Sequence, residues 1–326
     1  MKNYTNNGIY YEDSDFVLNV RDFSMKRRVK NFVIRLLYPI RNLYFKILVN
    51  LIRNYKEIRT KYNVVICSIF KDEAPFLKEF IEYHKMLGVD HFYLYNNFST
   101  DNYKEVLKPY IDKGIVTLTE WPVQSGQIPA YEHWKYNYKK DSKWVSFLDL
   151  DEFICPVYDY DIVSWLNRYK KYPVLLLDWV MFTSSGLLEH DCQKLVIEQY
   201  TQCWHKRGRI GKLFMNCRFD YNEDTSMMHY LKVKFGSFKI LPFNASGNIV
   251  DETGFQYVNK KQYSIQCNHY YCKAYDRLHN KISRGSAVYK TSWKKLEIYW
   301  PREMNGVNRD YTIQRFLLKL KVILNY

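Results

Sequence analysis

Apolar and polar residues alternate in blocks along the middle of the chain, and the blocks predict strands and helices in turn. Residues 64–70 form a short apolar run typical of a buried strand, and the helical pattern that follows ends at Gly88. Further strands are predicted at residues 91–95, 115–118 and 144–148, and further helices at 103–113 and 130–138. This alternation predicts an α/β fold with a largely parallel central sheet and flanking helices. Beyond Pro173 the pattern weakens, with strands predicted at 174–177 and 195–199.

The two ends of the chain have a different pattern. Residues 27–53 mix apolar side chains with cations such as Arg41 and Lys46, and no uncharged window approaches the ~20 residues that a membrane span needs. We predict basic amphipathic helices broken near Pro39, which either lie on an anionic membrane surface or pack on the main domain as a helical flap. Residues 311–326 have the same character and leave the same two alternatives. The predicted organisation is a basic helical segment at 1–61, an α/β domain at 62–290 and a second basic helical segment at 291–326.

Composition narrows the class of protein and of partner. The formal charge of +15 indicates an anionic partner, and membrane phospholipid, nucleic acid and phosphorylated substrates all satisfy that condition. Apolar residues at 47% and aromatic residues at 18% exclude a disordered chain. The seven cysteines form no C-x-x-C pair and are interpreted as reduced thiols. Because the start of the chain also lacks the apolar stretch of a secretory signal, we expect a cytoplasmic location.

Three carboxylates follow the predicted strand at 144–148, with apolar residues on both sides of them: Asp149, Asp151 and Glu152. Burying carboxylates without a partner is costly, and a divalent cation such as Mn²⁺ or Mg²⁺ bound to a diphosphate would supply the partner. On an extended strand end, Asp149 and Asp151 would face the same way. Polar clusters at 71–73 and 96–101 also follow strands directly, and ligands bind at the carboxyl ends of such strands. We therefore expect one crevice to collect all three clusters.

The cluster at 96–101 has a structural and a functional interpretation. Thr100 or Asp101 is predicted to cap the following helix, which would be an ordinary turn. Such capping would leave the side-chain amides of Asn96 and Asn97 available to a nucleobase or a ribose. Both interpretations can hold together.

At this point the sequence resembles a known family. Residues 67–84 and the Asp-x-Asp-Glu-Phe motif within 147–154 resemble glycosyltransferases of the family 2-like and family 92 groups, whose fold is the GT-A nucleotide-sugar-binding domain. The order of motifs is similar too: a Lys-Asp-Glu loop, Tyr-Asn-Asn-x-Ser-x-Asp, Asp-x-Asp-Glu-Phe, then Asn-His-Tyr-Tyr at 268–271 and Lys-Ile-Ser-Arg-Gly at 281–285. The resemblance covers about residues 62–290.

The resemblance implies roles for matching residues. The metal would be held by Asp149, Asp151 and His269, although His269 beside two tyrosines could equally be a core histidine. Donor contacts are expected from Glu73, Asn96, Asn97, Asp101, Gln127, Asp149 and Lys212. Two residues near Gln127 fall where related enzymes contact the donor, Tyr131 and His133. Phosphate charge would be offset by Lys212, Lys273 and Arg284, unless these cations merely face solvent.

The acceptor side is less well defined. Residues 179–191 resemble the acceptor-side stretch of the family, so Glu189 and Asp191 are candidates for the catalytic base, with Asp178 behind them. The usual Phe-Gly-Ser-Ser-Gly-His pattern departs here, since Thr183 replaces the first Gly and Leu187 replaces the His. These departures leave the identity of the acceptor open.

The function implied by the resemblance is metal-dependent transfer of a hexose, with galactose a candidate, from a UDP-sugar to a glycan or lipid-linked acceptor. Inversion at the sugar is implied as well, and the basic ends suit surface polysaccharide or lipopolysaccharide synthesis at the inner face of the membrane. Two alternatives stay open. A metal-dependent nucleotidyl or phosphoryl transferase would use similar carboxylates, but the chain has no G-x-x-x-x-G-K-[ST] loop. A basic nucleic-acid-binding protein is the other, but zinc-finger spacing and RNP motifs are missing, so we expect no nucleic-acid partner.

Overall fold

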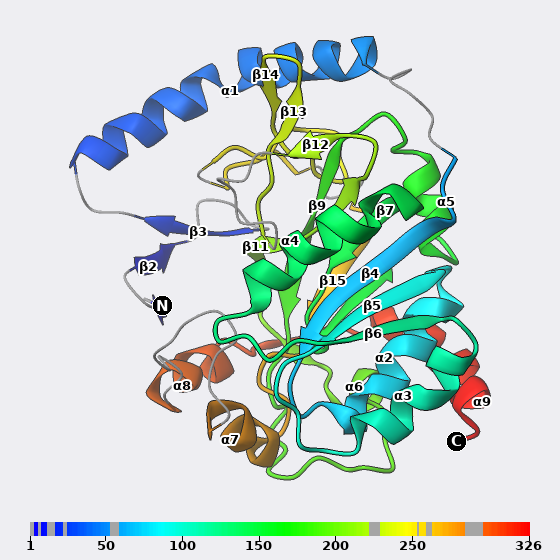
Figure 1. The fold of residues 1–326 in the computed structure, drawn as a ribbon. Coiled ribbons are helices and arrows are strands. Elements are labelled where there is room, and N and C mark those ends of the chain that lie inside the picture. Colours follow the sequence, from blue (N-terminus) through cyan, green and yellow to red (C-terminus); the bar gives the residue numbers. More distant parts are fainter. Residues whose placement is uncertain are drawn as a thin grey trace.

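The fold is built on one large curled sheet. The computed structural model describes residues 3–5, 8–11, 17–21, 25–52, 59–221, 229–252, 254–258, 263–283 and 296–326. Within these ranges, eleven strands form the main sheet and two smaller sheets lie beside it. Figure 1 shows helices flanking the sheet, with α1 across the top and the C-terminal helix α9 at the opposite end.

The first half of the sheet is parallel. Its order is β7 (Ser142–Phe147), β4 (Tyr62–Phe70), β5 (His91–Asn96) and β6 (Val116–Glu120), and each neighbouring pair is parallel. The connecting helices are α2 (Ala74–Met86), α3 (Tyr103–Asp112) and α4 (Gln127–Tyr138). The predicted α/β alternation is confirmed. Because all the strands run the same way, the loops after β4, β5 and β7 meet at one edge of the sheet.

The second half of the sheet is mostly antiparallel. Strand β11 (Arg207–Asn216) lies between β7 and β9 (Val174–Met181) and is antiparallel to both. Beyond β9 come β15 (Ile265–His269), parallel to β9, and β8 (Glu152–Pro156), antiparallel to β15. In this register His269 stands opposite Glu152. The curled sheet thus brings the end of β15 beside the turn that joins β7 to β8.

Shorter elements complete the described structure. Strands β12 (Asp220–Tyr221), β13 (Val233–Phe235) and β14 (Phe238–Ile240) form a small sheet, and helices α5 (Ile162–Asn167) and α7 (Tyr275–Ser283) flank the core. In the C-terminal segment, α8 (Leu296–Met304) is followed by β16 (Asn308–Arg309), which pairs with β10 (Gln202–Cys203). A 3₁₀ helix (Thr312–Phe316) and α9 (Leu317–Leu324) follow. Two buried side chains of α9, Leu320 and Leu324, join the main core.

The N-terminal segment holds strands as well as the predicted helix. Strands β1 (Asn3–Thr5), β2 (Gly8–Tyr11) and β3 (Val17–Arg21) form antiparallel pairs, and β3 joins the main sheet beside β11. The helical expectation for residues 1–61 is therefore incomplete. These strands are only three to five residues long, so their pattern carried little signal.

Helix α1 (Met25–Leu51) runs through Pro39 without a break, so the predicted break is wrong. A proline inside a helix costs about 3 kcal/mol, because it removes a backbone donor and crowds the preceding turn. Contacts on either side of Pro39 offset this cost: the hydroxyl of Tyr38 donates to the carbonyl oxygen of Ile249 at 2.6 Å, and Oδ1 of Asn42 accepts from the Ile249 amide at 3.0 Å. The helix therefore packs on the main domain, which was one of the two arrangements predicted for this segment. No helix in the described ranges is long and apolar enough to cross a membrane.

Residues 196–199 are helical, not extended, so the strand prediction at 195–199 is wrong. Helix α6 (Val196–Gln199) begins where the buried carboxylate of Glu79 accepts hydrogen bonds from the amides of Val196 and Ile197, at 2.8 and 3.2 Å. A carboxylate in this position satisfies the free amides of a helix N-terminus. It comes from α2, 117 residues earlier in the chain, and a local pattern does not carry that information.

The cysteine expectation is confirmed. All seven cysteines lie among the described residues and all are free thiols; Cys192 is exposed and the other six are buried. Buried thiols of this kind act as small apolar side chains in the core.

The close approach of β11 to β9 yields a stability prediction. At Gly211, next to an irregularity in the β9–β11 register, an added Cβ would lie 1.7 Å from the carbonyl oxygen of Leu177. Gly211→Ala is expected to lower the free energy of unfolding by more than about 3 kcal/mol, because the two backbones must separate. As the control, Gly186→Ala meets no atom within 4 Å, and its positive φ of +79° should cost only about 1–2 kcal/mol. Urea unfolding measures both, and equal losses would contradict the close approach.

Candidate active site

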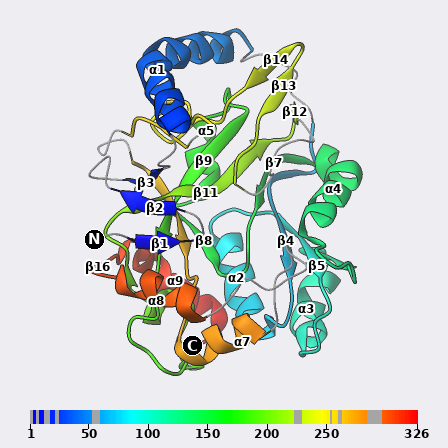
Figure 2. The same cartoon turned by 90° about the vertical axis from the view of Figure 1, so that its left-hand side faces the viewer.

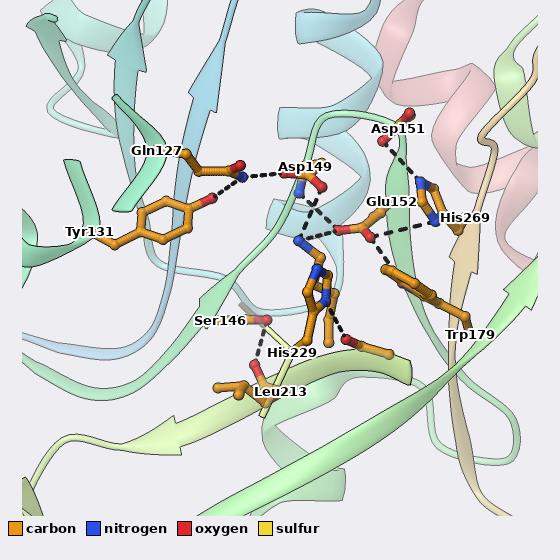
Figure 3. Close-up of polar contacts among 12 residues, drawn as sticks. Gln127, Tyr131, Ser146, Asp149, Asp151, Glu152, Trp179, Leu213, His229 and His269 are labelled. Atoms are coloured by element: carbon orange, nitrogen blue, oxygen red, sulfur yellow. Dashed lines mark hydrogen bonds and ion pairs between the residues drawn. The ribbon is translucent and has the colours of Figure 1, made fainter. Parts of the chain in front are cut away.

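Asp149 and Asp151 lie on the tight connection between β7 and β8, and Glu152 is the first residue of β8. Residues 148–151 belong to neither strand, and the amide of Glu152 donates to the carbonyl oxygen of Asp149 at 3.0 Å to close the turn. The expectation that Asp149 and Asp151 face the same way on a strand end is therefore wrong. Figure 3 shows the side chain of Asp149 directed toward Gln127 and that of Asp151 toward His269.

Lys212 of β11 lies at the centre of the site. Its side chain is fully buried, and Nζ lies 3.1 Å from Oδ2 of Asp149 and 3.1 Å from Oε2 of Glu152. Burial disfavours the ammonium, but the two carboxylates outweigh it and raise the pKa of Lys212 above its ordinary value. Burial acts against the carboxylate of Asp149 as well, yet Lys212 holds its pKa below the usual range. Lys212 therefore stays charged and is the counter-ion of Asp149 and Glu152.

Glu152 is the most enclosed of the three carboxylates. It accepts hydrogen bonds from the amide of Asp149 and from Nε1 of Trp179, each at 2.9 Å, and Nδ1 of His269 lies 3.8 Å from its Oε1. Burial raises the pKa of Glu152 to about 7, and Lys212 offsets only part of that effect. With its oxygens engaged on every side, Glu152 positions its neighbours.

Asp151 lies between a histidine and a lysine. Its Oδ1 is 3.5 Å from Nε2 of His269, and its Oδ2 accepts from Nζ of Lys281 at 2.5 Å. Burial alone would raise the pKa of Asp151, but Lys281 and His269 hold it well below the usual range. On the far side of the ring, Nδ1 of His269 has no hydrogen-bond partner among the described residues.

This pair can be tested as a place for a metal ion. A carboxylate oxygen of Asp151 and a ring nitrogen of His269 are donors that Mn²⁺ accepts, and the two atoms are close enough to share one ion. The part of the chain that the structure describes gathers no group of three or more His, Cys, Asp or Glu side chains for a metal. The carboxylate of Asp149 contacts Gln127 and Lys212, and its predicted role as a metal ligand stays a prediction. The residues fit an ion with two protein ligands whose other positions go to phosphate oxygens and water, as is usual for ions that bind substrate phosphates.

A pocket beside Asp151 gathers cations and one further predicted residue. Glu73, Lys273, Arg277 and Lys281 all line it. Nζ of Lys273 lies 3.4 Å from Oε2 of Glu73. Glu73, which was predicted to contact the sugar nucleotide, therefore lies in the same pocket as Asp151. Arg284, also predicted to offset phosphate charge, lies outside the described residues.

The polar side chains of the loop after β5 form hydrogen bonds within the protein that hold the loop in place. The amide group of Asn96 donates to Tyr103 and Glu120, and that of Asn97 donates to the carbonyl oxygens of Trp121 and Val123, over distances of 2.6–2.9 Å. The expectation that these amides are free to donate to a nucleobase is therefore wrong. A nucleoside would have to meet this loop through other atoms.

The capping prediction for this loop is also wrong. Oδ2 of Asp101 accepts from the amide of Ala74 at 2.7 Å, so it caps α2 and not the helix that follows it. Thr100 contacts Oδ1 of Asp72 instead. These bonds tie the loop after β5 to the loop after β4. Oδ1 of Asp101 is buried and has no hydrogen-bond partner in the described ranges.

The residues predicted on α4 separate into two groups. Nε2 of Gln127 donates to Oδ1 of Asp149 at 2.9 Å and lies 3.2 Å from the hydroxyl of Tyr131, so both belong to the carboxylate site (Figure 3). His133 instead contacts the hydroxyl of Tyr95 at 2.9 Å. Gln127 therefore acts on Asp149 directly.

The three candidate bases are not brought to the carboxylates. Glu189 and Asp191 lie on an exposed loop, and Asp191 pairs with Lys194 at 3.2 Å. Asp178 leaves β9 on the face opposite to Trp179 and accepts from Gln256 at 2.8 Å; burial raises its pKa to about 6. None of these three described residues lines the pocket beside Asp151.

Sequence reasoning missed four residues of the site. Glu152 was visible as the third carboxylate of its motif, and Lys281 as part of a family-like run, but neither was assigned a role. Trp179 began the family-like run at 179–191 but was assigned no role, and His229 had no recognisable signal. His229 contacts the carbonyl oxygen of Gly211 at 3.0 Å and packs edge-on against Trp179. Burial lowers the pKa of His229 to about 4, so it is neutral near pH 7.

The buried ammonium yields a prediction on stability and its pH dependence. Lys212→Met removes the cation that faces Glu152, and breaking a buried ion pair costs about 3–5 kcal/mol near pH 7.5. Without Lys212, the folded-state pKa of Glu152 rises further above its unfolded value, so stability is retained at low pH and lost as the pH rises through the folded pKa. The loss measured by urea unfolding should be smaller at pH 5.5. Lys319→Met on exposed α9 is the control and should change stability by less than about 0.5 kcal/mol at either pH; a pH-independent loss for Lys212→Met would contradict the ion pair.

Comparison with known proteins identifies the family. A model of glycosyltransferase family 92 matches residues 61–298. A glycosyltransferase family 92 protein of Arabidopsis thaliana is 32% identical over 242 residues, which is 74% of this chain and 40% of that protein. One of Oryza sativa subsp. japonica is 25% identical over 241 residues, 73% of this chain and 38% of that protein. The chain thus spans about two fifths of the length of these relatives.

Solved structures are only slightly similar. S. aureus TarS 1-349 in complex with UDP-GlcNAc is 17% identical, with a TM-score of 0.29, over 39% of this chain and 37% of that one. The same fragment in complex with UDP is 12% identical, also with a TM-score of 0.29, over 39% and 38% of the two chains. Likeness at this level says nothing about the ligands of this protein. The match to the family model covers most of the chain, and on that ground this protein belongs to glycosyltransferase family 92.

Proposed function

We propose that this protein is a metal-dependent glycosyltransferase that transfers a hexose from a UDP-sugar to a glycan or lipid-linked acceptor. Membership of family 92 supports the class of reaction. The observation that carries the proposal is the buried pair of Asp151 and His269, 3.5 Å apart, beside a pocket lined by Lys273, Arg277 and Lys281. Two metal-binding side chains next to three cations suit a diphosphate.

In this proposal Asp151 and His269 hold Mn²⁺ or Mg²⁺. When bound, the ion supplies positive charge for the departing diphosphate. Asp149 is 37% exposed, and two of its contacts, with Gln127 and Lys212, orient its carboxylate. The carboxylate of Asp149 would accept a hydrogen bond from a hydroxyl of the sugar nucleotide, and Lys212 would keep this carboxylate ionised.

An inverting transfer needs a base on the acceptor side, and we propose Glu189 for it. Its loop is hydrogen-bonded to the start of α7, since the amides of Tyr275 and Asp276 donate to the carbonyl oxygens of Leu187 and Leu188. Helix α7 also carries Lys281, so the loop and the pocket belong to neighbouring structure. Asp191 is the weaker choice, because Lys194 already neutralises it. Galactose is the first sugar to test.

Ligand-dependent melting tests the donor site. Mn²⁺ with UDP at a hundredfold excess over Kd should stabilise the fold by about 2.7 kcal/mol and raise the melting temperature by a few degrees, while GDP and CMP should not. Asp151→Asn should abolish the shift. Asp159→Asn is the control, because Asp159 pairs with Arg168 on the surface.

Product analysis separates the proposal from its rivals. Release of UDP from a UDP-hexose supports glycosyl transfer, whereas transfer of UMP would indicate a nucleotidyl transferase. No nucleotide-dependent shift in folded protein, together with salt-sensitive binding of single-stranded nucleic acid, would favour a nucleic-acid-binding protein.

We also propose that the protein binds an anionic membrane through α1. The face of α1 that packs on the domain carries Tyr38, Asn42 and Val49. The opposite face exposes apolar side chains spaced three or four residues apart, each 52–76% exposed: Val29, Phe32, Leu36, Ile40, Leu43, Ile47 and Leu51. Figures 1 and 2 show α1 along the outer boundary of the molecule, where a flat surface could reach it.

Charge favours an anionic lipid surface over a protein partner. Helix α1 contains no acidic residue and seven basic ones: Lys26, Arg27, Arg28, Lys30, Arg35, Arg41 and Lys46. Arg35, Arg41 and Lys46 contact the domain at Phe255, Glu252 and Asn248, so the apolar stripe would make the contact with the bilayer and the net positive charge of the helix would favour anionic lipid. Free thiols suit a reducing compartment, so we propose the inner, cytoplasmic face, where a lipid-linked acceptor for surface polysaccharide or lipopolysaccharide would lie.

Vesicle co-sedimentation tests this surface. The protein should bind phosphatidylglycerol-containing vesicles at low salt and be released from them at high salt. Replacing Leu36 and Leu43 together by Gln should weaken binding at least tenfold, because each apolar side chain contributes roughly 1.5 kcal/mol or more when buried. Leu318→Gln on α9, where the leucine is 77% exposed, is the matched control and should bind as the parent does. Unchanged binding of the double variant would exclude α1 as the docking face.

A further inference from the structure

Lys281 binds the second carboxylate oxygen of Asp151, next to the oxygen that faces His269. It lies on the last turn of α7, and its Nζ is 2.5 Å from Oδ2 of Asp151 and 3.0 Å from the carbonyl oxygen of Tyr271. An ammonium has only donors and carries a positive charge, so Lys281 and a divalent cation repel each other at one carboxylate. An ion held by Oδ1 of Asp151 and by His269 would therefore bind against the charge of Lys281, and would bind more tightly once Lys281 has left Oδ2.

Lys281 is placed so that it can move. Its side chain is 16% exposed, and its Nζ lies over the ring of Tyr271 at 4.2 Å. Lys212, in contrast, is fully enclosed and held by two carboxylates. The side chains of Lys273 and Arg277 line the same pocket as Lys281. An anion entering this pocket would be the natural new partner for the Lys281 ammonium.

We infer that Lys281 exchanges partners during the reaction: it pairs with Asp151 in the empty enzyme and with the donor diphosphate when metal and nucleotide are bound. This inference rests on the proposed glycosyltransferase function. In the transfer, the bond between the sugar C1 and the diphosphate oxygen breaks, and its electron pair stays on that oxygen. The acceptor oxygen bonds to C1 and its proton passes to the base. Lys281 then faces the negative charge that develops on the diphosphate.

The exchange makes metal and nucleotide binding cooperative. Without nucleotide, the ion must compete with Lys281 for Asp151, so its affinity is low. With the diphosphate present, Lys281 has another partner and the competition ends. Such coupling is reciprocal, so Mn²⁺ and UDP each strengthen the binding of the other.

Electron paramagnetic resonance of free Mn²⁺ measures this coupling without any turnover. The parent protein should bind Mn²⁺ weakly alone and at least tenfold more tightly with UDP. Lys281→Met should bind Mn²⁺ alone about tenfold more tightly than the parent, because a hydrogen bond between charged groups no longer opposes the ion. It should gain little from UDP, and kcat should fall by at least a hundredfold. Lys281→Arg keeps the charge and should retain the coupling, and Lys319→Met should resemble the parent.

The outcomes separate the inference from the proposed function. If the parent binds Mn²⁺ with UDP, but Lys281→Met binds Mn²⁺ alone no more tightly and keeps full coupling, the exchange is overturned and the donor site stands. If the parent binds no UDP in the presence of Mn²⁺, the proposed function is contradicted, and so is the exchange of partners by Lys281, which depends on it. Thermal melting without ligand checks that each variant is folded. If Lys281→Met does not fold, Lys281→Gln replaces it in the Mn²⁺-binding measurement, because it also removes the charge.

Discussion

The ammonium of Lys212, buried between Asp149 and Glu152, is the interaction on which the site depends. The turn between β7 and β8 buries Asp151 and Glu152 and leaves Asp149 37% exposed, and without cations the buried carboxylates would be too costly to keep ionised. Lys212 reaches Asp149 and Glu152 from β11, the strand that joins the parallel and antiparallel halves of the sheet. With this charge in place, Glu152 can hold Trp179 and stand beside His269. The arrangement of the whole turn therefore follows from one charge on a neighbouring strand.

The site uses its cations in two different ways. Lys212 is enclosed and belongs to the permanent structure, whereas Lys281 lies at the end of a helix and at the edge of a pocket. In the empty site Lys281 is the counter-ion of Asp151, and in the loaded site a divalent ion would take that role. The Asp151 carboxylate is therefore next to positive charge in both states. The two faces of α1 also differ in role. Tyr38 binds the helix to the domain, whereas the apolar side chains on the opposite face are exposed. Both features separate the groups that maintain the fold from the groups offered to a partner.

The sequence by itself determined the architecture of the parallel half and the neighbourhood of the site. Strands buried on both faces are mainly apolar runs, so β4, β5 and β7 could be recognised without their partners, whereas β6 is a partly buried edge strand in which apolar residues alternate with threonines. Polar clusters that directly follow such strands must meet at one edge of the sheet, which placed Glu73 and the three carboxylates near one another. Family-like motifs were local runs as well, and the match to family 92 agrees with them.

Only the tertiary structure decided which way the side chains point and what they bind. Helix α6 forms because Glu79 satisfies its first amides, and Asp101 caps α2 and not α3, and both contacts cross long stretches of chain. The tight turn sends Asp149 and Asp151 to different partners, which a D-x-D spelling does not encode. Lys281, 130 residues from Asp151, reaches it only because β15 carries the chain back beside β8. Local patterns report the burial of a segment, whereas hydrogen bonds and ion pairs between distant segments depend on how the sheet curls, and that is set by all its strands together.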